Sequence, residues 1–197
     1  MTFSIASHCH ETGMLGVAVS TALLCVGQLC PFPRAGVGTI STQSFVNPYL
    51  GLRGLDYLEA GMDATAVRDR LAAEDEGRAI RQFAVVDRVG GSAAYSGVDC
   101  VPWFGHLAGD GYAVAGNMLT GEDVVAEMAN VYEASSEHPF AERLVLALEG
   151  GQAVGGDTRG RQSSALKMME TEDYPLIDIR VDDRPDPIVE LRRIWDL

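Results

Sequence analysis

Apolar and polar residues alternate at the start of the chain, on both sides of a short polar turn. The runs Thr2–Ser7, around Phe3 and Ile5, and Leu15–Ser20 both follow this period of two, and the turn between them ends at Gly13. Two alternating runs joined by a short turn predict a β-hairpin. We therefore expect the first residues to be held rigidly in a sheet, whereas most chain ends fray.

Later patterns predict a mixture of further strands and helices. Short apolar or alternating runs indicate strands at 35–45, Gln82–Asp87 and Ser92–Gly97. Further strands are expected to end at Asn117, to follow from the glycine-rich segment 150–169 and to begin at Asp178. Helical spacing indicates helices at Leu50–Ala60, Ala64–Ala73, Gly121–Ala134, Pro139–Leu148 and after Asp186. We expect Asp63 and Asp186 to cap two of these helices, and Gly150 with Gly151 to end a third.

The composition is that of a globular protein. Hydrophobic residues make up 47% of the 197 residues and charged residues 22%, so we expect one domain that spans residues 1–197. A net charge of -13 repels phosphates and anionic lipid headgroups, because binding either requires clustered Lys and Arg. We therefore expect neither a nucleic acid nor a membrane as a partner.

Four unevenly spaced cysteines do not form the pattern of a disulfide-rich secreted scaffold. The apolar run from Met14 to Val26 is preceded by no Lys or Arg and is too short to cross a bilayer. Together these features favour reduced thiols and a cytoplasmic location.

Thr2 is the leading candidate for a catalytic residue. If Met1 is removed, Thr2 carries a hydroxyl and a free α-amine, which provide a nucleophile and its base in one residue. Arg34 stands at the entrance of the predicted strand 35–45, where it would lower the pKa of that amine if it lay against it. The alternative for Arg34 is a solvated position at the rim of the protein.

Two further regions offer polar groups for a site. The side-chain amide of Asn117 could donate a hydrogen bond to an oxyanion, or Asn117 could simply be a turn residue beside Gly116. The glycine-rich segment 150–169 carries Asp157, Arg161, Gln162 and Ser163, which could orient Thr2 or bind a polar substrate. Its glycine spacing fits neither a dinucleotide-binding motif nor a P-loop.

Cysteine and histidine residues suggest two weaker sites. Cys100 with His106 could form a thiolate and its base, although buried packing is the more usual role of such a cysteine. His8 and His10 would share one face of an extended segment, as metal ligands do, but no third ligand is evident nearby. We therefore expect no metal ion and no other cofactor.

Six separated motifs occur in order along nearly the whole chain: MTFSI, GVAVST, AGVGTISTQ, AGNMLTG, GGDTRGRQSSAL and RVDDRPDPIVELRR. Together they resemble the uncharacterised family called domain of unknown function 1028. That family is similar to the N-terminal nucleophile (Ntn) hydrolases, which implies an α+β fold with a four-layer α/β/β/α sandwich of two antiparallel sheets. The resemblance makes Thr2 the leading candidate nucleophile, but it implies no particular substrate.

The sequence therefore predicts an amidohydrolase that acts on a small-molecule or peptide-like amide. The expected catalytic residues are Thr2, Arg34, Asn117 and Asp157, and the expected substrate-binding residues are Gln43, Arg161, Gln162 and Ser163. A homodimer is possible, because the amphipathic C-terminal helix could cover a neighbouring copy as well as its own core. The alternative function is a non-catalytic protein that binds a small ligand on the same fold.

Overall fold

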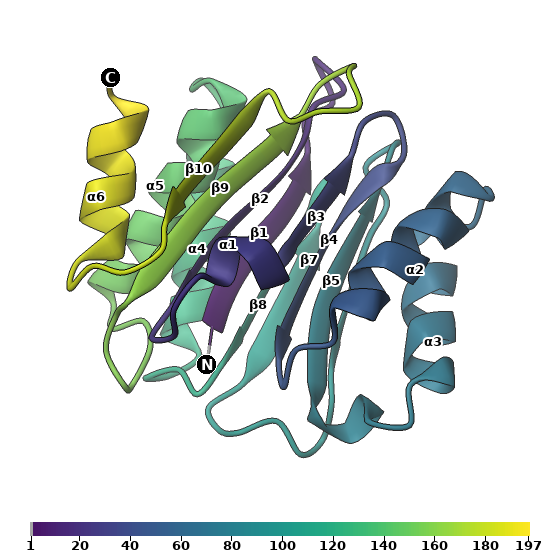
Figure 1. Cartoon of the computed structure of the whole chain (residues 1–197), viewed down its shortest axis with the longest axis horizontal. Helices are drawn as coiled ribbons and strands as arrows, with labels where there is room; N and C mark the ends of the chain where they lie inside the picture. The colour runs from purple at the N-terminus through teal and green to yellow at the C-terminus, as the bar shows by residue number, and fades with distance from the viewer. Residues whose placement is uncertain (1) are drawn as a thin grey trace.

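The computed structural model describes residues 2–197, and Met1, whose removal the Thr2 hypothesis requires, lies outside them. Within that range, six antiparallel strands form a larger sheet in the order β10-β9-β2-β1-β8-β7 (Figure 1). These strands are β1 (Thr2–His8), β2 (Leu15–Thr21), β7 (Gly105–Gly109), β8 (Tyr112–Asn117), β9 (Ser163–Met169) and β10 (Ile177–Val181).

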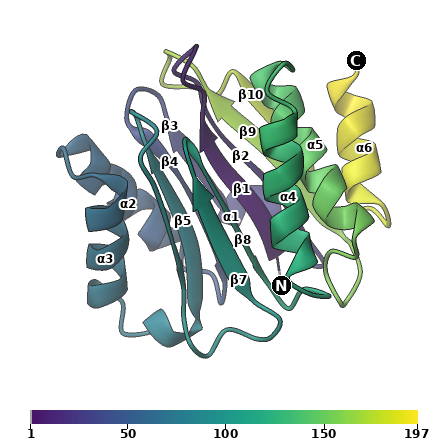
Figure 2. The same cartoon turned by 180° about the vertical axis from the view of Figure 1, so that it is seen from behind.

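A second antiparallel sheet has the order β3-β4-β5-β6. Its strands are β3 (Pro31–Arg34), β4 (Gly38–Ser44), β5 (Arg81–Asp87) and β6 (Ser92–Ser96). The helices are α1 (Val26–Leu29), α2 (Pro48–Glu59), α3 (Ala64–Glu74), α4 (Asp123–Ala134), α5 (Phe140–Ala153) and α6 (Pro187–Trp195), and a 3-10 turn covers Arg78–Ile80. Figures 1 and 2 show α2 and α3 beside the smaller sheet and α4, α5 and α6 beside the larger one.

The predicted N-terminal hairpin is confirmed, and its first strand lies inside the larger sheet. β1 pairs with β2 on one side, from Phe3 opposite Ser20 to His8 opposite Leu15, and with β8 on the other. All residues of β1 and β2 are buried, because both faces of these strands are covered. The alternation in the sequence therefore separates two buried faces rather than a buried face and an exposed one.

The two faces of β1 differ in chemistry. Phe3 and Ile5 belong to an apolar core formed with α4 and α5. On the other face Ser4 lies 3.0 Å, Oγ to Oγ, from Ser41 of the smaller sheet, so that this face lies between the sheets. Ala6 shares an inter-sheet cluster of small residues with Ala84, where short side chains allow close packing.

Two predictions about helix ends are wrong. α5 does not end at Gly150 and Gly151 but continues to Ala153. A Cβ on Gly150 or Gly151 would lie 2.8 Å from the side chain of Val131 or 2.6 Å from that of Met128, so these glycines let α5 approach α4 closely. Asp186 makes no side-chain capping bond at the start of α6, because its carboxylate pairs with Arg161.

The longest helix in residues 2–197 is α5, with 14 residues. No helix in this range combines the length and the hydrophobicity needed to cross a bilayer.

Candidate functional site

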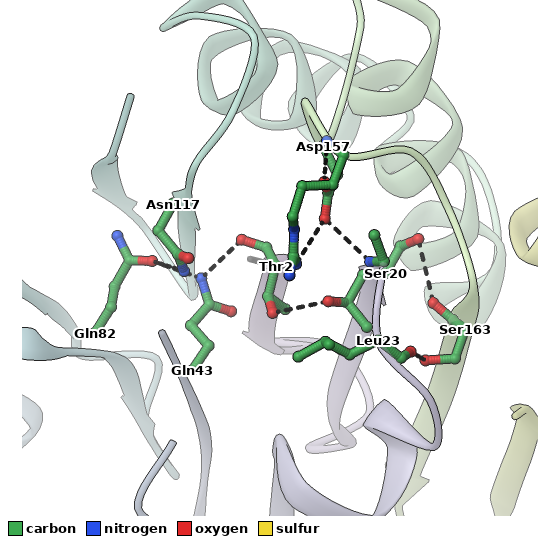
Figure 3. Close-up of polar contacts among 11 residues, drawn as sticks. Thr2, Ser20, Leu23, Gln43, Gln82, Asn117, Asp157 and Ser163 are labelled. Carbon is green, nitrogen blue, oxygen red and sulfur yellow. Dashed lines mark hydrogen bonds and ion pairs between the residues drawn. The ribbon is translucent and has the colours of Figure 1, made fainter. Parts of the chain in front are cut away.

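Thr2 begins β1 and lies in a buried polar region. It pairs with Asn117 of β8, and only 6% of its surface is exposed. Its hydroxyl donates to Thr21 Oγ1 at 3.2 Å, which ties Thr2 to the end of β2. Figure 3 shows Thr2 between three side-chain amides on one side and Asp157 on the other. The hairpin thus holds the Thr2 hydroxyl in a fixed position.

Gln43 of β4 reaches Thr2 from the smaller sheet. Its Nε2 donates to the main-chain oxygen of Thr2 at 3.3 Å and to Gln82 Oε1 at 2.7 Å. Its Oε1 accepts from Ser4 Oγ at 2.7 Å. Both amide hydrogens and the amide oxygen of Gln43 are therefore used within the protein. Gln43 lies in the site as expected, but it positions Thr2 rather than offering donors to a substrate.

Gln82 of β5 connects these amides and was not among the residues predicted from the sequence. Its Oε1 accepts from Gln43 and from Asn117 Nδ2, the latter at 2.9 Å. Its Nε2 lies within hydrogen-bond distance of Ser96 Oγ (2.7 Å), Gly105 O (3.1 Å) and Gly116 O (2.8 Å). Gln82 is fully buried. A glutamine within a run of buried strand residues is unusual, and this is the signal that could have identified it.

Asn117 keeps part of its hydrogen-bonding capacity. One of its two amide hydrogens is directed to Gln82, and the described residues provide no second partner for this side chain. Since Asn117 lies directly opposite Thr2 in the sheet, the remaining N–H is suitable as a donor to negative charge that develops beside Thr2.

Asp157 acts on Thr2 through β2. Its side chain is 1% exposed and forms an ion pair with Arg159. Its Oδ2 accepts from the main-chain N–H of Ala22 at 3.0 Å, next to the Thr21 that accepts from Thr2. Asp157 also forms an isolated β-bridge with Leu119, two residues after Asn117. The structure therefore brings Asp157 to the site, where it anchors the strand end that holds Thr2.

The other residues of the glycine-rich segment have different roles. Ser163 donates to the carbonyl of Leu23 at 2.5 Å and accepts from the N–H of Val26 at 3.1 Å, which fixes the loop after β2. The guanidinium of Arg161 pairs with Asp186, and Gln162 Nε2 donates to Asp183 Oδ1 at 3.3 Å. The structure does not direct the side chains of Arg161 and Gln162 to Thr2.

Arg34 is also not brought to Thr2. It pairs with Gly38 at the start of β4, five residues before Gln43, or about 17 Å along an extended strand. Its Nη1 forms ion pairs with Asp56 at 3.2 Å and with Glu59 at 2.9 Å. The expected effect of this cation on the pKa of the Thr2 amine therefore has no geometric basis.

Cys100 and His106 do not form a nucleophile and base pair. The Cys100 thiol donates to the carbonyl of Arg81 at 3.3 Å, whereas His106 Nδ1 lies 2.9 Å from Ser96 Oγ. Burial raises the pKa of the Cys100 thiol. A reactive cysteine needs the opposite shift, so this side chain is a packing residue.

Two cavities lie at opposite ends of β1. A small one of about 50 Å³ adjoins Thr2, Thr21 and Gln43, and its wall includes Leu24 and Leu29. A larger one of about 490 Å³ adjoins His8, six residues and about 20 Å from Thr2 along the strand.

The fold and site define a mixed α/β protein with two packed antiparallel sheets and a polar site at the first residue of its central hairpin. The chain belongs to the Family of unknown function (DUF1028), whose model matches residues 2–191. A crystal structure of protein SPO2555 from Silicibacter pomeroyi, assigned to the same family model, is similar to it, with a TM-score of 0.91 and 28% identity. The match covers 99% of this chain and 88% of that chain. No curated protein matches the chain.

Proposed function

We propose that the protein is an N-terminal nucleophile amidohydrolase, with Thr2 as the nucleophile after removal of Met1. Thr2 Oγ attacks the carbonyl carbon of an amide, and the α-amine of the same residue takes the hydroxyl proton. The nitrogen leaves with a proton from that amine, and water then releases the acyl group from Thr2. The observation that carries this proposal is the Thr2 hydroxyl, held at 3.2 Å from Thr21 Oγ1 beside the Asn117 amide.

The surrounding residues have separate roles in this proposal. The second N–H of Asn117 donates to the oxyanion that forms on the attacked carbonyl. Gln43 holds the main chain of Thr2, and Asp157 holds the end of β2. The proposed fold is the four-layer α/β/β/α sandwich of the Ntn hydrolases, and the helices outside each of the two packed sheets support it.

The cavity beside Thr2 suggests which amides fit. Its volume of about 50 Å³ is small compared with the about 300–1,000 Å³ of sites for drug-sized ligands. Leu23, Leu24 and Leu29 line it, and none of the described residues in its wall has a charged side chain. We therefore place a short, uncharged acyl group in this cavity, with the scissile carbonyl at Thr2.

A direct test uses short-chain acyl p-nitroanilides with protein whose N-terminus has been verified by intact-mass spectrometry. The expected result is cleavage by protein that begins at Thr2, loss of cleavage in Thr2→Ala, and partial retention in Thr2→Ser. Thr12→Ala removes an exposed threonine from the β1–β2 turn and serves as the matched control. Equal cleavage by Thr2→Ala and by protein with a verified free Thr2 would contradict the proposal.

The same samples distinguish the amidohydrolase from the alternative, a non-catalytic binding protein. A non-catalytic binding protein would cleave none of the anilides whether or not Met1 is present, and it would bind them equally well with Thr2→Ala. Binding is measured by the ligand-dependent rise in melting temperature.

A further inference from the structure

The cavity of about 490 Å³ is separate from the Thr2 site. It lies among the β1–β2 turn, the α4–α5 connection, the β9–β10 hairpin and the end of α6, at the far end of the larger sheet from Thr2. Figure 2 shows these helices beside that sheet. Its volume is in the range of small-molecule sites, about 300–1,000 Å³. The Thr2 chemistry makes no use of it.

One wall of this cavity is apolar. It is formed by Met14, Phe140, Met168, Ile177 and Trp195, which come from four separate parts of the chain. Phe140 and Met168 also belong to the core between the larger sheet and its helices, so this wall is a continuation of the core. Methionine side chains adapt their shape to irregular apolar groups. The wall is therefore suited to the apolar body of a ligand.

A cation lies in the same cavity. Arg143 of α5 stacks on the ring of Tyr132, with its guanidinium carbon 4.1 Å from the ring centroid. Its Nη2 donates to the main-chain oxygen of Tyr132 at 3.3 Å. Within residues 2–197, Arg143 has no carboxylate at salt-bridge distance, and its Nε has no hydrogen-bond partner. In a chain with a net charge of -13, a partly buried arginine without a carboxylate is unusual.

The other polar groups of the cavity do not neutralise Arg143. Asp110 is 91% exposed and pairs with His10 Nε2 at 3.2 Å, and Glu11 is also exposed at the rim. Burial, followed by the interaction with His10, lowers the pKa of His8, which disfavours the charged form of its imidazole. Among the buried and half-buried described residues that line the cavity, Arg143 therefore provides the uncompensated charge. The planar fork of its guanidinium matches a carboxylate.

We propose that this cavity binds a small amphipathic carboxylate, with the carboxylate on Arg143 and the apolar body against Phe140, Met168 and Trp195. The ligand class follows from a half-buried cation and an apolar wall that line the same cavity. A short-chain fatty acid or an arylalkanoic acid has this chemistry. The proposal does not depend on any activity of Thr2.

Isothermal titration calorimetry with hexanoate, butyrate and hexanamide tests the ligand class on the unaltered protein. We expect hexanoate to bind, and butyrate to bind about fifteenfold more weakly, because it lacks two CH₂ groups and each buried CH₂ contributes about 0.8 kcal/mol, a factor of about four. Hexanamide should bind at least tenfold more weakly than hexanoate, because it cannot form the charged pair. Absence of hexanoate binding at millimolar concentration, or equal binding of hexanamide, would overturn the proposal.

The affinities of two arginine variants and the fluorescence of Trp195 test whether the ligand binds in this cavity. Arg143→Gln should weaken hexanoate binding at least tenfold, whereas Arg53→Gln should leave it unchanged. Arg53 is the matched control, because its guanidinium also lies over a tyrosine ring, that of Tyr49, at 5.9 Å. In a Trp103→Phe background Trp195 is the only tryptophan, and its fluorescence should change on hexanoate binding. Equal affinity of Arg143→Gln, or unchanged fluorescence of Trp195, would contradict binding in this cavity.

Discussion

Replacing Gln82 by methionine tests the hydrogen-bond network around Thr2. The two side chains have similar length and volume, so the change removes polar groups without opening a cavity. Gln82 is fully buried, and its amide oxygen is the acceptor for both Gln43 Nε2 and Asn117 Nδ2. In Gln82→Met these two donors lose that acceptor, and the residues that carry them, Gln43 and Asn117, are each only 2% exposed.

The expected loss of unfolding free energy in Gln82→Met follows from the two donors that lose their acceptor. A buried polar group left without a partner costs about 1–3 kcal/mol, so the free energy of unfolding should fall by about 2–6 kcal/mol. This is a large share of the total stability of a typical domain, about 5–15 kcal/mol. The carbonyls of Gly105 and Gly116 lose a donor as well, but a carbonyl with two lone pairs tolerates this better.

Urea unfolding followed by circular dichroism measures this loss. Gln28→Met is the matched control, because Gln28 is exposed on α1, and we expect its unfolding free energy to change by less than about 0.5 kcal/mol. A fall of less than about 1 kcal/mol in Gln82→Met, with an unchanged m-value, would refute the view that this amide organises the site.

The variant Gln82→Glu tests the role of the Gln82 amide through the pH dependence of stability. The variant keeps one acceptor oxygen but places a second oxygen where Nε2 faced two carbonyls. Burial and this repulsion raise the pKa of the new carboxyl above its unfolded value of about 4.3. Its penalty is therefore absent below that unfolded value and grows as pH rises through the folded pKa. The stability difference from wild type should be smaller at about pH 4 than at about pH 7.

Three further changes have defined outcomes. Gly97→Ala places a Cβ 2.2 Å and 2.3 Å from two backbone carbonyl oxygens, so urea unfolding should show a loss of about 3 kcal/mol, whereas Gly121→Ala meets no atom within 4 Å and should be close to neutral. A hydrogen bond from Arg192 lowers the pKa of Glu142. The stabilisation that the ionised Glu142 provides is present above its unfolded pKa of about 4.3 and is lost as pH falls through its folded pKa. The difference in unfolding free energy between wild type and Glu142→Gln should therefore shrink between about pH 6 and pH 3. Arg34→Gln should change neither anilide cleavage nor its pH profile, because its ion pairs lie on α2, and loss of cleavage in this variant would contradict the site described above.

Local patterns in the sequence were sufficient for several elements. The alternation around Phe3 and Ile5 predicted the hairpin because both faces of β1 have distinct partners. The predicted cap of α3 is confirmed, since Asp63 Oδ1 accepts from the N–H of Ala66 at 2.8 Å. An alternating run and a helix cap are each visible within a few consecutive residues, so the sequence alone indicates them.

The parts of the site that could not be predicted depend on contacts between distant residues. Gln43 and Gln82 meet because β4 pairs with β5 in a particular register, and nothing in either run specifies that register. Arg34 lies close to β4 in the sequence, but in space it pairs with Gly38 at the start of β4, whereas Thr2 is contacted by Gln43 near the other end of that strand. Two consecutive glycines such as Gly150 and Gly151 usually end a helix. Here they lie inside α5, because a side chain at either position would collide with α4.

The chemistry of the inter-sheet layer argues for a role beyond stability. Where Ala6 meets Ala84, the layer is a cluster of alanine and valine side chains. Near Thr2 the same layer consists instead of buried amides and hydroxyls, each of which must find partners to offset its loss of water. An apolar layer would be a simpler solution for packing, because each polar group left without a partner in such a layer costs stability. The layer is polar at the end where it fixes the main chain of Thr2 and leaves one N–H of Asn117 available, so we infer that positioning these two groups is the reason for its polarity.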